Sequence, residues 1–289
     1  MYTIARKPLF FLLAIMAIVS LACGISVPVQ VKTGPTVTDQ ISVPLTSGND
    51  LPYAVTLSFG AGNFTLTPGA SNAVVSGTAT YNVTDFKPKI TINQAVVSVE
   101  QGNLKLGGIP NFQNKIKNDW SLQLGDVPMR LSVSAGAYTG RYELGGLPLQ
   151  SLSISDGAAD VNLSFSSPNP GNMDTFGYTT GASSVKLSNL ANAHFAEMKF
   201  RSGAGDYRLD FSGDLRFDTS VTIESGLSSV TIVVPVGVPA SVTFEGGLTN
   251  VQPEGQWVKN GNEYHQTGSG PSLDITVKMG AGNLKLQNP

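Results

Sequence analysis

The sequence has few of the side chains that build most catalytic and metal sites. It holds one cysteine and two histidines in 289 residues, so a disulfide framework or a zinc cluster of Cys and His ligands has no residues to form it. Only 13% of the residues are charged, and the formal net charge of −2 lacks the basic excess typical of nucleic-acid-binding domains. The composition therefore predicts no metal, no cofactor and no nucleic-acid partner.

The two histidines show no partner pattern that would indicate catalysis. His194 lies in an expected loop and His265 in an expected hairpin, far apart in the chain. No serine sits in the strained strand-to-helix turn that presents a nucleophile. A Ser/His/Asp triad assembled across the fold stays open as an alternative, because triads are recognised by geometry and not by sequence position. We assign no catalytic residue and predict that the protein is not an enzyme.

Two groups of acidic residues suggest a lesser alternative, a polysaccharide-active β-solenoid enzyme that binds Ca²⁺ through several Asp and uses a Lys or Arg base. Asp206, Arg208 and Asp210 would share one outer strand face, and Asp156 and Asp160 flank a glycine turn. The favoured interpretation is a solvated face with balanced charges. No loop here offers the six or more oxygen ligands that calcium requires.

Five aromatic residues could form a glycan-binding surface, although packing in the core and at edges is the favoured interpretation. They are Tyr138, Tyr142, Tyr178, Trp257 and Tyr264.

Glycine is abundant, with 32 residues, and much of it belongs to one repeated phrase. The phrase reads Gly, then Ala or Leu, then a variable residue, then a short polar residue, then a mostly apolar one. Its first glycines are Gly60, Gly136, Gly157, Gly181, Gly203, Gly226, Gly247 and Gly280. From Gly136 to Gly247 the steps are 21, 24, 22, 23 and 21 residues, a fixed period that indicates a repeat architecture.

Each position of the phrase has an expected structural role, shown here for the copy that begins at Gly203. The first glycine suits a turn with positive φ, and Ala204 is expected to tuck beneath that turn. Asp206 at the fourth position can bond nearby backbone. Tyr207 and Leu209 begin an inward row, because they alternate with polar neighbours at the two-residue period of a half-buried strand.

Apolar and polar residues alternate on both sides of each turn, which predicts an all-β stack of short strands. One unit of about 22 residues cannot bury a face alone, so successive units must cover one another, as in a β-solenoid. The segment 101–106 is a copy that has lost its first glycine. Asn260 and Gly261 predict a hairpin in the longer step after Gly247. The last strand is expected near an open end of the stack, where capping or a partner should cover it.

The N-terminus is typical of a targeting segment. Arg6 and Lys7 precede an apolar stretch at 8–21, and the chain then reads Ser-Leu-Ala-Cys at 20–23. These four residues resemble the lipobox of bacterial lipoproteins, which implies cleavage before Cys23 and acylation of that residue. An uncleaved membrane anchor is the alternative. Both predict a body outside the cytoplasm, held to a membrane at the cell envelope.

The chain divides into four predicted parts. Residues 1–22 form a signal peptide and 23–36 a lipidated tether. Residues 37–110 form an irregular β part and 111–289 a regular β-repeat part, with a polar loop between them.

The glycine phrases, together with 118–120, 124–128 and 165–170, resemble the toast-rack family of bacterial envelope lipoproteins over roughly residues 37–289. That family is similar to adhesin domains and to the cell-wall-active-antibiotic-response (LiaF-like) proteins. The resemblance implies an all-β stack and carries no catalytic residue or cofactor.

We therefore expect a non-enzymatic, lipid-anchored envelope protein whose β-repeat surface binds cell wall, glycan or another protein. An accessory role in the envelope response to stress or cell-wall antibiotics is the alternative that the resemblance adds. The sequence leaves the oligomeric state open, because fold alone does not determine function or partners.

Overall fold

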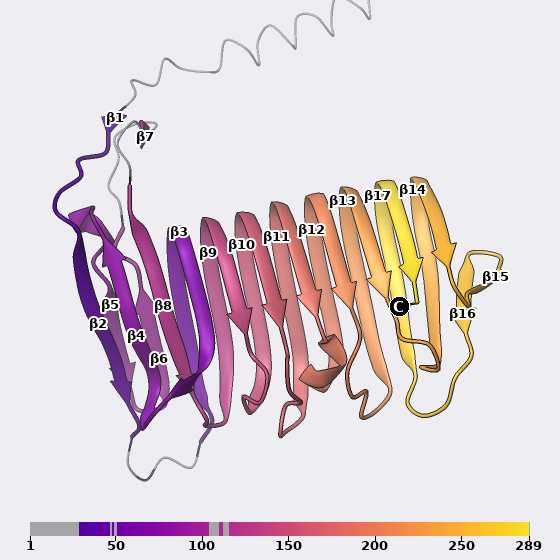
Figure 1. Ribbon diagram of the computed structural model, residues 1–289, viewed down its shortest axis with the longest axis horizontal. Coiled ribbons are helices and arrows are strands. Elements are labelled where there is room, and N and C mark those ends of the chain that lie inside the picture. Colours follow the sequence, from indigo (N-terminus) through magenta and orange to yellow (C-terminus); the bar gives the residue numbers. More distant parts are fainter. Residues whose placement is uncertain (1–28, 47, 49–50, 104–109, 112–115, 289) are drawn as a thin grey trace, which may run out of the picture.

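The computed structural model describes residues 29–46, 48, 51–103, 110–111 and 116–288, and most of them are in β-strands (Figure 1). Two single 3₁₀ turns occur in these ranges, η1 (Thr84–Phe86) and η2 (Leu190–Ala193). None of the helices in the described ranges is long and apolar enough to cross a membrane. The predicted all-β class is confirmed.

Fifteen strands form one sheet, and two short strands, β1 (Val29–Gln30) and β7 (Pro110–Asn111), pair separately. The fifteen are β2 (Val37–Pro44), β3 (Tyr53–Ala70), β4 (Ala73–Tyr81), β5 (Lys89–Asn93), β6 (Val96–Glu100), β8 (Asn118–Gly125), β9 (Met129–Glu143), β10 (Leu149–Ser164), β11 (Met173–Ser188), β12 (Phe195–Asp210), β13 (Thr219–Val233), β14 (Ala240–Glu254), β15 (Val258–Asn260), β16 (Glu263–Gln266) and β17 (Leu273–Gln287).

The sheet order is β15-β16-β14-β17-β13-β12-β11-β10-β9-β3-β8-β4-β2, with β6 also beside β3 and β5 beside β6. From β9 to β13 the strands follow chain order, and all of these neighbours are parallel. The result is a row of similar rungs, where a rung is the strand of one repeat (Figure 1). The predicted solenoid-like stack is confirmed.

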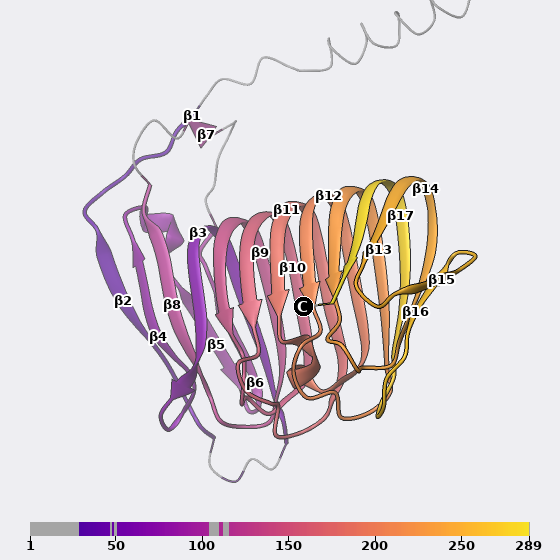
Figure 2. The same ribbon diagram turned by 45° about the vertical axis from the view of Figure 1, so that its right-hand side comes forward.

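Each long strand bends once near its middle, so that its two halves face each other across the core (Figure 2). In β12, Phe200 lies before the bend and Tyr207 after it, and their ring centroids are 5.3 Å apart. The ladder to β13 continues on both sides of the bend, from Ser202 opposite Ser225 to Ala204 opposite Leu227. The expected pair of short strands around a turn is therefore wrong. Each unit is one bent strand.

The core runs along the stack between the two strand halves. Phe64, Val185, Leu209 and Ile232 are all buried in it, which confirms the predicted inward row. The same apolar cluster extends from β2 to β17. Strands β2 to β6 of the first predicted part and β8 to β17 of the second therefore share one sheet and one main core.

The first glycines of the phrase stand side by side at the crest, which is the outer side of the bend. The strand registers align Gly60, Gly136, Gly157, Gly181, Gly203, Gly226, Gly280 and Gly247 in this sheet order. None of them has the positive φ that we expected. They are glycines because the rungs approach closely: a Cβ on Gly136 would lie 2.4 Å from the carbonyl oxygen of Gly60.

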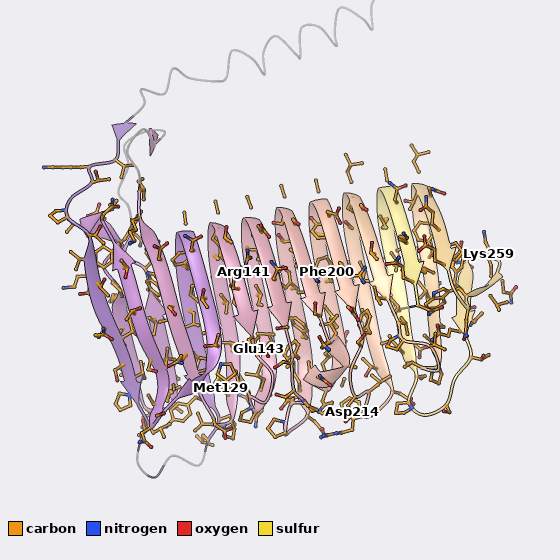
Figure 3. The ribbon with its side chains drawn as sticks, in the orientation of Figure 1. Met129, Arg141, Glu143, Phe200, Asp214 and Lys259 are labelled. Atoms are coloured by element: carbon orange, nitrogen blue, oxygen red, sulfur yellow. The ribbon has the colours of Figure 1, made fainter. Side chains whose placement is uncertain are left out.

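Positive φ occurs two residues later, at the third position of the phrase. Gly62, Gly205 and Gly282 have φ of 132°, 152° and 134°, values that residues with a side chain rarely adopt. The second position is also different from the expectation, because its side chains stand out from the crest instead of tucking beneath it. Leu227 is 67% exposed and Leu248 is 87% exposed. Figure 3 shows this row of side chains projecting along the crest.

The copy without its first glycine is a rung in two pieces. β6 pairs with the first half of β3, and β8 pairs with its second half. The Gln101 side chain occupies the glycine place: its Oε1 accepts hydrogen bonds from the Gly60 backbone N–H at 2.9 Å and from Asn118 Nδ2 at 2.7 Å. The strand expected within 104–106 falls outside the described residues.

The final strand lies close to one end of the stack, as predicted, but it is not the end rung and its place is out of chain order. β17 lies between β13 and β14 and is parallel to both. The predicted hairpin is present as β15 and β16, with Gly261 at φ 63°. It pairs with the first residues of β14 and covers that half of the end strand. The repeat period could not reveal this order, because rungs of equal register are interchangeable neighbours.

Replacing a crest glycine should measure how closely the rungs approach. Gly136→Ala should lower the free energy of unfolding by about 1–3 kcal/mol, because the added methyl forces the two backbones apart. Urea unfolding followed by circular dichroism checks this. Gly171→Ala is the matched control, since its Cβ would meet only the Asn169 side chain, at 3.7 Å. Equal stability of the two variants would contradict the packing explanation.

Candidate binding surface

The stack has two outer faces, formed by the strand halves before the crest (the first face) and after it (the second face). Because neighbouring rungs are in register, outward side chains at equivalent positions line up in columns across the sheet. Neighbouring members of a column are about 4.8 Å apart, the spacing between paired strands. Each face is therefore a regular array of polar groups.

A column on the first face alternates in charge. Arg201, Glu224, Lys278 and Glu245 stand side by side on β12, β13, β17 and β14. Arg201 Nε lies 3.0 Å from Glu224 Oε2, and Lys278 Nζ lies 3.6 Å from Glu245 Oε2. A shallow cavity of about 610 Å³ opens beside them. The opposite charges neutralise one another, so this column offers hydrogen bonds and little net charge.

The acidic residues considered for a calcium site lie on the second face and do not converge on one. Arg208 lies between Asp206 and Asp210 in sequence, and these three alternate with buried residues as predicted. Arg208 Nη1 donates to Gln287 Oε1 at 3.0 Å, and Asp210 Oδ1 accepts from the Ser212 N–H at 3.0 Å. The described part of the chain contains no group of three His, Cys, Asp or Glu side chains placed to hold a metal ion.

Asp160 is exposed, but Asp156 points inward into a buried polar cluster. Its carboxylate accepts hydrogen bonds from Tyr178 Oη at 2.7 Å, from Tyr138 Oη at 3.4 Å and from the Thr180 hydroxyl. Burial, followed by the negative charge of Asp156, raises the pKa of Tyr178 far above its ordinary value. These neutral donors hold a carboxylate in the core, where it needs such partners.

All five aromatic residues considered for a glycan surface are buried, so that alternative is wrong for them. Tyr138 and Tyr142 belong to the polar cluster around Asp156, and their hydroxyl oxygens are 2.9 Å apart. Trp257 and Tyr264 pack where the β15–β16 hairpin meets the core, with Lys259 Nζ 5.6 Å from the Tyr264 ring centroid. Figure 3 places Lys259 at this end of the stack.

The two histidines have separate partners. His194 follows η2 and is buried, with Nδ1 2.8 Å from the Asn169 carbonyl oxygen and Nε2 3.6 Å from Asp214 Oδ2. His265 lies on β16, with Nε2 3.3 Å from Glu263 Oε2. None of these partners is a serine, so they form no triad-like arrangement with either histidine. Cys23, the predicted lipidation site, lies outside the described residues.

Glu143, at the end of β9, is held by several donors that sequence reasoning missed. Partial burial acts to raise its pKa, but hydrogen bonds from Ser164 and from the N–H groups of Ser166 and Gly145 outweigh burial and lower the pKa. Figure 3 labels Glu143 near the lower end of its strand. The carboxylate fixes the loop that joins β9 to β10 against the loop after β10.

Comparisons with known proteins bear on the family and the fold. Residues 32–175 match the family described as the N-terminal domain of toast_rack, DUF2154. The crystal structure of a "putative cell adhesion protein" from Clostridium sporogenes is 18% identical, with a TM-score of 0.52 over 88% of this chain and 100% of that one. This likeness shows the fold alone.

Two further crystal structures are similar over 90% of this chain and 100% of their own. One is a "putative lipid binding protein" from Parabacteroides distasonis, 8% identical with a TM-score of 0.43. The other is a "putative adhesin" from Bacteroides fragilis, 10% identical with a TM-score of 0.36. No curated relative matches the sequence.

The lowered pKa of Glu143 predicts a pH-dependent contribution to stability. A carboxylate whose pKa is lower in the folded chain stabilises it above the unfolded pKa, near 4.5, and this contribution is lost as pH falls through the folded pKa. Glu143→Gln should therefore lower the melting temperature at pH 7, and the difference from the wild type should shrink below pH 4.5.

Glu197→Gln is the control, because Glu197 is a half-exposed residue whose ion pair is with Lys199 on the same strand. It should change melting little at any pH. A Glu143→Gln chain that melts like the wild type at neutral pH would contradict the role of this carboxylate.

Proposed function

Because the chain belongs to the toast-rack family through its residues 32–175, we propose that it is a lipid-anchored protein of the bacterial cell envelope that binds the cell wall through its outer faces. The observation that carries this proposal is the in-register array of polar columns on a rigid stack. Such an array offers a polar group at the same place on successive rungs, which suits a partner that is itself a repeating polymer.

The anchor rests on the N-terminal sequence. A charged start, an apolar stretch and Cys23 after a small residue fit a lipoprotein signal, and 23–36 would tether the body to the outer side of the membrane. Several acyl chains on one terminus make such attachment stable. The faces of the stack would then be free to contact wall polymers.

We infer further that the protein binds without catalysing a reaction. The residues on which the enzyme alternative depended are separated by the fold: Asp156 is buried beneath tyrosines, whereas Asp206 and Asp210 lie on the outer face. The two cavities that open beside the charged columns are shallow, and none of the acids of the enzyme alternative lines them. This arrangement suits adhesion better than chemistry.

One experiment with Cys23→Ser separates the anchor from the binding surface. In cells fed a clickable palmitate analogue, the wild type should be labelled and Cys23→Ser should not, while the control Ser20→Ala should keep the label. In detergent, the wild type and Cys23→Ser should both co-sediment saturably with purified bacterial cell walls. An unlabelled wild type would refute the anchor, and a wild type that stays in the supernatant would refute wall binding.

A further inference from the structure

One column on the second face carries cations and neutral polar groups and no carboxylate. In sheet order it consists of Arg141, Asn162, Lys186, Arg208, Thr231 and Lys285, on β9, β10, β11, β12, β13 and β17. We call these six residues the basic column. It differs from the first-face column, in which each cation stands beside an acid.

Most cations of the basic column have no acidic partner within the described chain. Lys186 and Arg208 stand directly opposite each other on neighbouring strands, an arrangement that destabilises a sheet. Among the described residues, Arg141, Lys186 and Arg208 form no ion pair, whereas Lys285 pairs with Glu254 at 2.9 Å. An anion placed between Lys186 and Arg208 would remove the repulsion.

Acidic rows border this column and make it narrow. Asp160 and Asp206 lie two residues before it on their strands, nearer the crest, and Glu143 and Asp210 lie two residues after it. Glu143 and Asp210 are already engaged by backbone N–H groups of neighbouring loops. A flat anionic surface such as a membrane would meet these acids as well as the cations, whereas a single thin chain can follow the cations between the two acidic rows.

A cavity marks the start of this strip. About 280 Å³ of space opens between Arg141 and Lys186, and its lining includes Asn162, Thr65 and Glu143, whose carboxylate is already engaged by loop N–H groups. Ligand pockets for drug-sized molecules start at roughly 300 Å³, so this one suits a single unit of a longer chain. Arg141, labelled in Figure 3, stands on β9 at this position.

We propose that the basic column binds a linear acidic polysaccharide laid across the rungs, with its carboxylates on Arg141, Lys186 and Arg208. The rungs repeat every 4.8 Å or so, close to the length of one extended pyranose unit. Guanidinium groups bind carboxylates in a paired geometry, and Asn162 and Thr231 can bond sugar hydroxyls. This inference rests on the proposed wall-binding function and names its ligand class.

Titration calorimetry with the full chain in detergent tests the proposal, with oligogalacturonate of defined length as the probe. The triple variant Arg141→Gln, Lys186→Gln, Arg208→Gln should weaken binding roughly tenfold or more, and added salt should weaken the wild type in the same direction. The control triple Arg130→Gln, Lys199→Gln, Arg201→Gln removes the same charge from the first face. It should change affinity by less than about twofold.

The methyl ester of the same oligomer, which lacks the charge, should not bind. Equal losses in both triples would overturn the proposal, because bulk charge would then explain binding. Polyphosphate bound as tightly and with the same variant dependence would overturn the choice of a carboxylated glycan. The wild type could fail to bind oligogalacturonate while the wild type and both triple variants still co-sediment with cell walls. That result would refute the role of the basic column and leave the proposed wall binding supported.

Discussion

The close approach of one rung to the next is the constraint on which the rest of the structure depends. Parallel ladders hold neighbouring backbones at sheet spacing through the bend, and the crest glycines leave no side chain between them. Under this condition the apolar residues of each rung are covered by those of its neighbours. Tyr178 and Phe200, on β11 and β12, stack with centroids 5.5 Å apart in this way.

The same register organises the outside of the molecule. Because each rung repeats its neighbour, polar side chains line up in columns. Each column corresponds to one position in the repeat, and that position determines the charge and hydrogen-bonding groups of the column. The position two residues before the crest glycine carries the alternating charges of Arg201 and Glu224. The position five residues after it carries the basic column. A surface of this kind recognises extended, repetitive partners more readily than a compact ligand.

Local features were predictable from the sequence, and features set by neighbours were not. Alternation identified buried residues such as Tyr207, and the hairpin at Gly261 followed from a dipeptide signal. The role of the crest glycines was misassigned, because their constraint is a carbonyl on the adjacent rung and not their own φ. The same alternation, continued from Ile154, would have placed Asp156 inside.

The order of the strands is the most direct test of in-register stacking. In a chain carrying Ser229→Cys and Asn283→Cys, the two thiols sit opposite each other on β13 and β17 and should form a disulfide on mild oxidation. Ser229→Cys with Asn250→Cys should not, because β17 lies between β13 and β14 and the Cα separation exceeds the roughly 7 Å that a disulfide can span. A disulfide in the Ser229→Cys, Asn250→Cys chain and none in the Ser229→Cys, Asn283→Cys chain would contradict this strand order.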